Sequence, residues 1–229
     1  ANAIGGQIPA IKTVGRWADD MVVLEPAAMK FALGENPKKT YSGRNEAPAT
    51  RMATAALMRE QLRKALEYAE RISKHEADPE NEDAPDYDAA LEALVPVVQG
   101  KLPVHFHAHR ADDIATALRI AKEFHLNYVL IHATEGYLVA DILAREGARA
   151  VVGPIIGDRS KPELAHQRVT NAARLVEAGV PVAICTDHSE LPIQYLLLSA
   201  ALAAGEGMNP EAALKAITLT AAELGGIAH

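Results

Sequence analysis

Residues 102–110 read LPVHFHAHR, a short apolar run in which His105, His107 and His109 occupy alternate positions. Side chains alternate between the two faces of a β-strand, so this run predicts a strand that carries all three histidines on one face. Histidine is a common metal ligand and the usual general base. Three histidines on one strand face therefore favour a metal or catalytic site over separate core or surface histidines.

The sequence after Gly100 alternates short apolar strands with helical segments. The expected strands are 102–107, 127–132, 149–153 and 181–186. The expected helices are 111–124, 136–146, 162–178 and 190–205, with a last helical pair over 209–225. Apolar, β-branched strands that alternate with helices are typical of a parallel sheet covered on both faces, so the fold class is α/β. The sequence contains neither GxGxxG after a strand nor GxxxxGK[ST], which disfavours a nucleotide-binding fold.

The first hundred residues are less regular. Composition and the three- and four-residue spacing of apolar side chains predict a long helix over 51–75. After an acidic loop, Asp86 is expected to cap a second helix that ends before Gly100. The remaining expectations are a Gly-rich loop at 1–20, short strands at 21–24 and 29–33, and a basic, polar loop at 38–50.

Composition limits the classes of function. The chain has 229 residues, 49% of them hydrophobic, which suits one large domain or two small ones. A net charge of −7 and an aromatic content of 4% disfavour a nucleic-acid partner. No apolar run approaches the length of a membrane span, and the first residues lack the basic start and apolar core of a signal peptide. The single cysteine, Cys185, fits a reducing, cytoplasmic compartment.

Polar residues follow the predicted strands at their carboxyl ends. The first strand ends at His107 and His109, the second at His132 and the fourth at Asp187, whereas the third ends at Gly153 and offers no ligand. Chemistry in parallel α/β proteins sits at these strand ends. Imidazoles and a carboxylate suit zinc, iron or manganese, and they leave room for a water molecule that the metal acidifies. The strand ends therefore predict a metal-dependent or catalytic site.

Three motifs at these strand ends match a known family. They are HAH at 107–109, IHATEG at 131–136 and TDH at 186–188, and the helical tail at 212–227 and the GENP turn at 34–37 match as well. In order and spacing, the chain resembles the amidohydrolase superfamily of metal-dependent (β/α)8-barrel hydrolases, and within it the imidazolonepropionase-related amidohydrolases. The resemblance implies a catalytic divalent metal, with zinc as the first candidate and iron or manganese as the others. It also implies hydrolysis of the C–N bond of an amide, cyclic amide or amidine.

The resemblance also implies roles for single residues. His107 matches the family's metal histidine on strand five, and His132 matches the strand-six histidine, which binds metal in two-metal members and orients substrate or water in one-metal members. Asp187 matches the strand-eight aspartate, which binds metal and moves the proton as general base and then acid. Glu35 matches a carboxylate that bridges two metals in some members. A solvated turn glutamate is the alternative for Glu35, and Lys30 is the other candidate for the bridge.

Other residues near these strand ends have weaker links to the site. We expect His109 to contact the substrate or the metal-associated water, and His188 to orient the neighbouring aspartate or the substrate. Arg159 lies on a loop at the same rim and is a candidate for binding a substrate carboxylate, with a surface salt bridge as the alternative. His105 lies one layer deeper in the sheet, where packing is the favoured role.

The family's first-strand His-x-His pair does not precede the matching motifs. The first histidine in the chain is His75, inside the long expected helix. We therefore expect residues 1–229 to be the C-terminal part of a TIM barrel, roughly strands 4–8 with their helices, with the N-terminal strands and an outer β domain absent. Such a fragment is expected to be inactive by itself.

An open half-barrel would expose a strand edge, so we expect the chain to form a homo-oligomer or to rearrange. The expected partner is a small-molecule substrate, with neither nucleic acid nor a membrane involved. Two other hypotheses stay open. One is a non-catalytic truncated barrel that self-associates through exposed strand edges, and the other is a non-hydrolytic α/β binding protein.

Overall fold

A single six-stranded sheet organises the chain. The structure, a computed structural model, describes residues 2–157 and 159–228. The strands are β1 (Ile4–Ile11), β2 (Val22–Ala32), β3 (Val104–Ala108), β4 (Tyr128–His132), β5 (Ala150–Val152) and β6 (Val182–Ile184), and they lie in chain order. β1 pairs antiparallel with β2, and all later neighbours pair in parallel. The α/β class is therefore confirmed, as a mixed and mostly parallel sheet.

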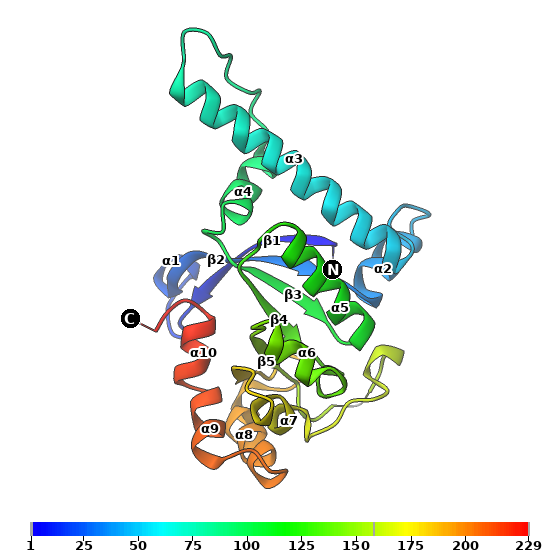
Figure 1. Ribbon diagram of the computed structural model, residues 1–229. Helices are drawn as coiled ribbons and strands as arrows, with labels where there is room; N and C mark the ends of the chain where they lie inside the picture. The colour runs from blue at the N-terminus through cyan, green and yellow to red at the C-terminus, as the bar shows by residue number, and fades with distance from the viewer. Residues whose placement is uncertain (1, 158, 229) are drawn as a thin grey trace.

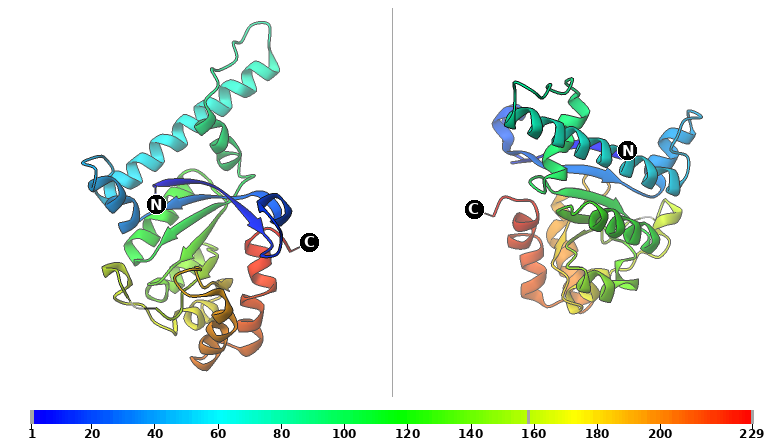
Figure 2. Two further views of the ribbon diagram at one scale, coloured as in Figure 1. Left: turned by 180° about the vertical axis from the view of Figure 1, so that it is seen from behind. Right: turned by 45° about the horizontal axis from the view of Figure 1, so that its top comes forward.

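Helices connect the parallel strands. They are α1 (Ala18–Met21), α2 (Glu35–Ser42), α3 (Arg51–Ala77), α4 (Ala89–Val98), α5 (Ala111–Glu123), α6 (Ala140–Arg145), α7 (Asn171–Glu177), α8 (Leu196–Gly205), α9 (Pro210–Ala216) and α10 (Leu219–Leu224). In Figure 1, α5 and α6 lie in front of the sheet, and α3 and α4 project from it as an arm. The two further views in Figure 2 show the same projecting arm. None of the helices in the described ranges is both long and apolar enough to cross a membrane.

One face of the sheet forms the main hydrophobic core. Phe31, Phe106 and Leu130 point to this face from adjacent strands and are fully buried. The two phenylalanine rings meet edge to face, with centroids 5.4 Å apart. Burial of such large side chains against the crossover helices is the main stabilising contribution to the fold. The opposite face carries a much smaller apolar cluster of Val129, Ala183 and Leu224, the last from α10.

The N-terminal segment differs from the expected loop. Residues 4–11 form β1, whose side chains alternate between half-buried and exposed along the strand. The sequence does not show this alternation clearly, because the glycines of β1 have no side chain that could mark a buried or an exposed position. Gly5 has a structural reason, because a Cβ there would lie 3.3 Å from Cγ of Lys30. The missing side chain makes room for the lysine stem on the neighbouring strand.

Two expected strands and one expected loop also differ. Most of the segments 21–24 and 29–33 lies in one strand, β2, although Met21 ends α1 and Leu33 follows the strand. The break expected at Pro26 is a bulge where the partner of β1 jumps from Ala28 to Leu24. Part of the expected loop at 38–50 is helical, since α2 runs from Glu35 to Ser42. The sequence predicts a turn at residues 34–37, whereas α2 begins within this segment, at Glu35.

The long helix and its neighbour follow the prediction closely. α3 covers the expected 51–75, and the Thr50 hydroxyl caps it by accepting the Ala53 N–H. The cap of α4 is Asp88 rather than Asp86, because residues 84–88 stay extended and only Asp88 directly precedes the helix. The later helices are shorter than expected. Those predicted at 136–146, 162–178 and 190–205 begin with 3-10 turns at Gly136–Leu138, Pro162–Leu164 and Ile193–Tyr195.

Candidate metal and active site

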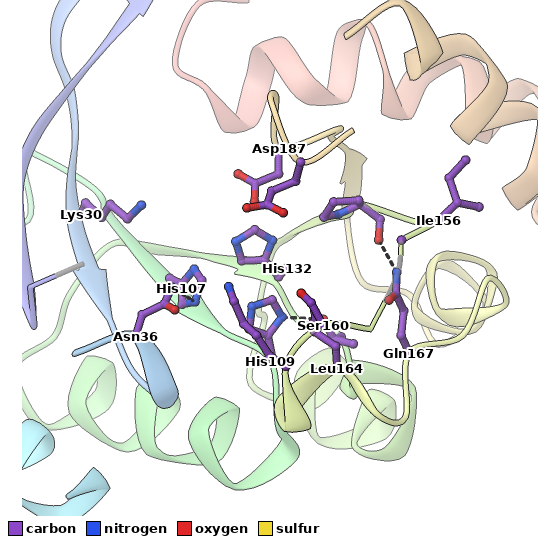
Figure 3. A pocket seen from close by; sticks show the side chains of 15 residues that line it. Lys30, Asn36, His107, His109, His132, Ile156, Ser160, Leu164, Gln167 and Asp187 are labelled. Atoms are coloured by element: carbon purple, nitrogen blue, oxygen red, sulfur yellow. Dashed lines mark hydrogen bonds between the residues drawn. The ribbon is translucent and has the colours of Figure 1, made fainter. Parts of the chain in front are cut away.

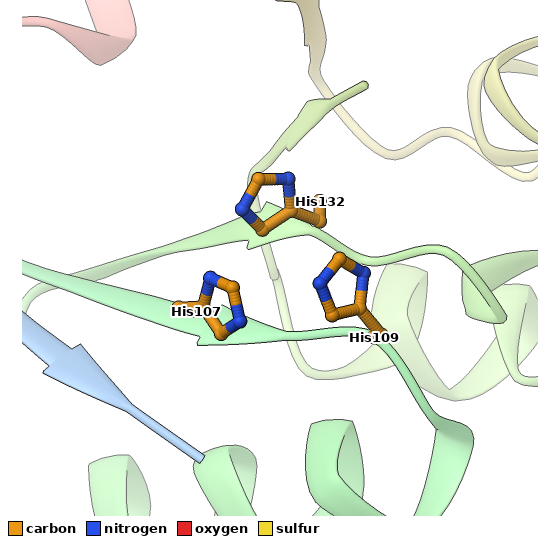
Figure 4. A group of neighbouring side chains, drawn as sticks. All are labelled: His107, His109 and His132. Atoms are coloured by element: carbon orange, nitrogen blue, oxygen red, sulfur yellow. The ribbon is translucent and has the colours of Figure 1, made fainter. Parts of the chain in front are cut away.

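Three histidines meet at the carboxyl ends of β3 and β4. His107, His109 and His132 each offer a ring nitrogen, and these nitrogens lie within 4.8 Å of one another. All three side chains are buried, with 4 to 5% of their surface exposed. Figure 4 shows the three imidazoles around one point, two from the β3 segment and one from the end of β4. This proximity allows the three imidazoles to form a group that could hold a metal ion.

Strand geometry explains why these rings converge. His107 lies opposite Ile131 in the parallel register, on the face away from the main core. Strict alternation would send the next residue on β4, His132, to the other face. Its backbone instead has φ of 72°, and Ala133 follows with φ of 42°. Positive φ is uncommon for residues other than glycine, and such conformations cluster at functional sites. The His132 ring stacks on His109, with centroids 4.6 Å apart.

Each of the three imidazoles has one nitrogen in a hydrogen bond. His132 Nδ1 lies 2.6 Å from the Gly153 carbonyl and donates to it, which leaves Nε2 with its lone pair. His109 Nδ1 lies 2.7 Å from the Thr134 hydroxyl, and His107 Nε2 lies 3.1 Å from the Asn36 amide. Such partners fix the orientation of metal-binding histidines in proteins.

The third strand contributes a carbonyl rather than a side chain. Gly153 has φ of 145°, and a Cβ there would lie 2.0 Å from the Cys185 carbonyl oxygen. Only glycine fits this close approach of two loops. The sequence predicts that the end of the third strand offers no ligand side chain. In the structure, this strand end instead orients His132 through the Gly153 carbonyl.

The site keeps its imidazoles neutral. Burial lowers the pKa of His109 to about 3, and the charges of His132 and Lys161 add to the effect. Burial also lowers the pKa of His107 and of His132. Neutral imidazole is the form that binds metal, so the protonation state at neutral pH suits a cation.

A cavity of about 310 Å³ opens over the three histidines. Figure 3 shows Asp187 above His132 and the amine end of Lys30 pointing towards the histidines. Both residues line the cavity, with Asp187 exposed and Lys30 half-buried. The loop after β5 supplies the opposite wall. Its lining residues include Pro154, Ile156, Gly157, Ser160, Lys161, Leu164 and Gln167.

The structure does not bring Glu35 to the cavity. Glu35 is buried in the first turn of α2, and its Oε2 lies 2.8 Å from Lys39 Nζ. Burial acts to raise the pKa of Glu35, but the bond to Lys39 outweighs it and the pKa is lowered. Its neighbour Asn36 faces the site instead, through His107. Of the two residues considered for a bridge between metals, only Lys30 lines the cavity.

Three other residues singled out in the sequence lie outside the lining. His188 is exposed next to Asp187 and is not among the residues that line the cavity. Arg159 is exposed, and its Nη2 donates to the Gln167 carbonyl at 2.8 Å within the same loop. His105 lies on the same sheet face as His107 but deeper, paired with Val129, and burial lowers its pKa to about 4.

Sequence reasoning missed a buried ionic network beside His109. Glu163 is 1% exposed, and its Oε2 accepts the Glu35 backbone N–H at 2.9 Å. Arg51 donates to both oxygens of Asp113, at 3.0 and 3.2 Å, and its Nη2 lies 3.9 Å from Glu163 Oε2. Burial raises the pKa of both Asp113 and Glu163. These residues are far apart in the sequence and follow no periodic pattern, so no signal marked them.

The donor set fits a divalent transition metal. Imidazole nitrogens suit zinc, iron and manganese, and the carboxylate of Asp187 lines the same cavity. The neutral rings are buried and oriented by partners outside the group, as in protein metal sites. The group of His107, His109 and His132 could therefore hold a metal ion.

Two known proteins are similar to the chain. An amidohydrolase named tasK from Hapsidospora irregularis is 28% identical over 254 residues, covering 99% of this chain and 25% of its own length. The crystal structure of an amidohydrolase from Thermotoga maritima MSB8 matches with a TM-score of 0.93 and 37% identity, over all of this chain and 59% of that one. The chain thus spans a quarter of the length of tasK and less than two thirds of the Thermotoga maritima chain. No family model matches the chain. Both similarities support an amidohydrolase assignment.

Proposed function

We propose that the chain is part of the catalytic unit of a metal-dependent amidohydrolase that cleaves a C–N bond in a small molecule. The observation that carries this proposal is the convergence of three buried, neutral imidazoles at the carboxyl ends of parallel strands. The similarity to two amidohydrolases over the whole chain supports it. An exposed carboxylate on the same cavity supplies the group that such chemistry needs for proton transfer.

The finer assignment is that β2 to β6 are strands 4–8 of a (β/α)8 barrel of the imidazolonepropionase-related kind. Two features support it. The parallel strands follow one another in chain order, with a helical crossover between each pair, as in a barrel and unlike a doubly wound sheet. The site lies at the carboxyl ends of these strands, where barrel enzymes keep their chemistry.

The chain's residues divide the work in this proposal. His107, His109 and His132 would hold the cation, and Asn36 and Gly153 orient two of the rings. When bound, a divalent cation supplies Lewis acidity and lowers the pKa of water. Asp187 accepts the proton of the attacking water and returns it to the leaving nitrogen. Its exposure allows exchange of that proton with solvent.

Metal content tests the proposal first. We expect zinc, iron or manganese at stoichiometric levels in the natural full-length protein, measured by atomic emission after removal of loosely bound ions. The double variant His107→Asn and His132→Asn should lose this metal. A full-length protein that binds none of the three metals would overturn the proposal.

Replacement of Asp187 tests the proton-transfer role. Asp187→Asn in the metal-loaded full-length protein should lower kcat by about 10²- to 10⁴-fold, because the amide cannot take a proton. The panel of substrates should contain amides, cyclic amides and amidines, with circular dichroism as the check on folding. The matched control is Asp86→Asn, in the exposed loop before α4, which should keep full activity. Unchanged turnover in Asp187→Asn would contradict the assigned role.

A further inference from the structure

One oxygen of the Glu163 carboxylate has no hydrogen-bond partner within the described ranges. This oxygen, Oε1, is buried and lies 3.8 Å from His109 Nε2. The other oxygen, Oε2, accepts the Glu35 N–H. A buried carboxylate oxygen without a partner is costly, and it normally signals a group that binds there. The free oxygen faces the three-histidine group rather than the rest of the ionic network.

The charges around Glu163 do not balance. Among the described residues, the buried network contains three carboxylates, from Glu35, Asp113 and Glu163. Arg51 and Lys39 lie within ion-pair distance of them, and Lys161 acts on Glu163 from a longer distance. Arg51 directs its closest contacts to Asp113 and approaches Glu163 only to 3.9 Å. Glu163 is therefore the carboxylate of this network with the weakest ion pairing, and its unpaired oxygen lies on the side that adjoins His109.

The histidine group has the opposite need. Three neutral imidazoles carry no charge, so a divalent cation among them would bring two positive charges into a buried site. Burying an ion without a counter-charge is strongly unfavourable. Asp187 also lines the cavity, but it is exposed and its charge is screened by water. A buried carboxylate close to the imidazoles stabilises the cation far more effectively.

Building on the proposed function, we propose that Glu163 supplies the buried negative charge that balances a divalent cation held by His107, His109 and His132. Glu163 acts as a charge-balancing and positioning residue. It lies on the 3-10 turn Pro162–Leu164 of the loop that forms one cavity wall. Its two oxygens have separate tasks, since Oε2 anchors this loop to α2 and Oε1 faces His109.

The test measures Zn²⁺ affinity by competition with a chromophoric chelator, on the natural full-length protein. Glu163→Gln removes the charge but keeps an oxygen for the Glu35 N–H. We expect it to weaken Zn²⁺ binding about 10- to 100-fold, as removal of an outer partner of metal ligands does. The matched control is Glu123→Gln, a carboxylate at the end of α5 that pairs with Arg59 outside this network. It should change Zn²⁺ affinity by less than about threefold.

A conservative variant guards against misfolding. Glu163→Asp keeps the charge but withdraws it by one methylene, so it should fold and lose less affinity than Glu163→Gln. Thermal denaturation of the metal-free variants reports folding separately from binding. Equal affinity in wild type and both Glu163 variants, or equal loss in Glu163→Gln and Glu123→Gln, would overturn this inference while leaving the proposed function intact. Failure of the wild type to bind Zn²⁺ would instead overturn the proposed function.

Discussion

The two faces of the parallel sheet use the same five strands for different purposes. One face presents Phe31, Phe106 and Leu130 to the crossover helices and is closely packed. The other presents His105 and His107 on β3, a short stretch of small apolar side chains on the neighbouring strands, and an open cavity. Within β3, residues that face opposite ways are adjacent in sequence. Stability and chemistry are therefore encoded by alternate positions of one strand.

This separation has a physical reason. Close packing tolerates little change in volume, whereas a binding site needs polar groups and room for a ligand. Alternation lets a strand satisfy both demands without conflict. It also predicts that neighbouring residues, substituted one at a time, affect different measurements.

The largest expected effect is on the packed face. Phe106→Ala should lower the free energy of unfolding by about 3–5 kcal/mol, because it deletes a fully buried ring that contacts Phe31 and Tyr128. Urea denaturation followed by circular dichroism measures the change. Phe106→Leu, which keeps most of the volume, should cost clearly less. A loss below about 1 kcal/mol for the alanine variant would mean that this face is not the main core.

At the next position of β3, His107, a substitution should affect metal binding rather than stability. His107→Asn should weaken Zn²⁺ affinity of the full-length protein by at least about 100-fold, which corresponds to about 2.7 kcal/mol. The stability of the metal-free protein should change by less than about 1 kcal/mol, since the variant keeps a polar partner for Asn36. Leu130→Ala on the packed face is the control, expected to lower stability without a comparable loss of affinity. Loss of stability alone in His107→Asn would break the proposed division between faces.

The smallest effect concerns pH. Burial, helped by the charges of Arg149 and Lys30, lowers the pKa of His105 to about 4 from the ordinary 6.5. Between pH 6.5 and about pH 4, His105 therefore binds a proton in the unfolded chain but stays neutral in the folded chain. The stability of the metal-free protein should be complete above pH 6.5 and should fall as the pH drops towards 4. Each such histidine contributes a slope of about 1.4 kcal/mol per pH unit.

The variant His105→Gln isolates this contribution. It should reduce the slope of stability against pH between 6.5 and 4 by about 1.4 kcal/mol per pH unit, measured by urea denaturation at a series of pH values. The control Met52→Leu, at an exposed position on α3 that carries no titratable group, should leave the slope unchanged. An unchanged slope in His105→Gln would show that this imidazole titrates normally in the folded protein.

Much of the fold was predictable because the periodic signal is strong after Gly100. The four strands that follow were placed within two residues, and so was α3, whose apolar spacing runs for seven turns. The N-terminal hairpin was not predictable. The glycines of β1 and the proline in β2 mask alternation, and the antiparallel pairing that creates these strands is a non-local contact.

The candidate site also has a part that was predictable from the sequence and a part that was not. The order of His107, His132 and Asp187 at strand ends predicts that they lie close together, and all three line one cavity, while their roles stay a prediction. The approach of His132 to His107 and His109 depends on positive φ angles at His132 and Ala133 that the sequence does not show. No sequence signal marked Glu163, because its contacts, such as the Glu35 N–H, come from elements over a hundred residues away.

The arm of α3 and α4 has a practical consequence for work with this protein. Its tip, residues 78–88, is exposed, and Figures 1 and 2 show it held away from the sheet that carries the cavity. Exposed loop tips are the sites where chains best accept insertions. A fluorophore, an affinity tag or a surface linker placed there would leave the cavity open. The arm thus offers an attachment point that is remote from the cavity.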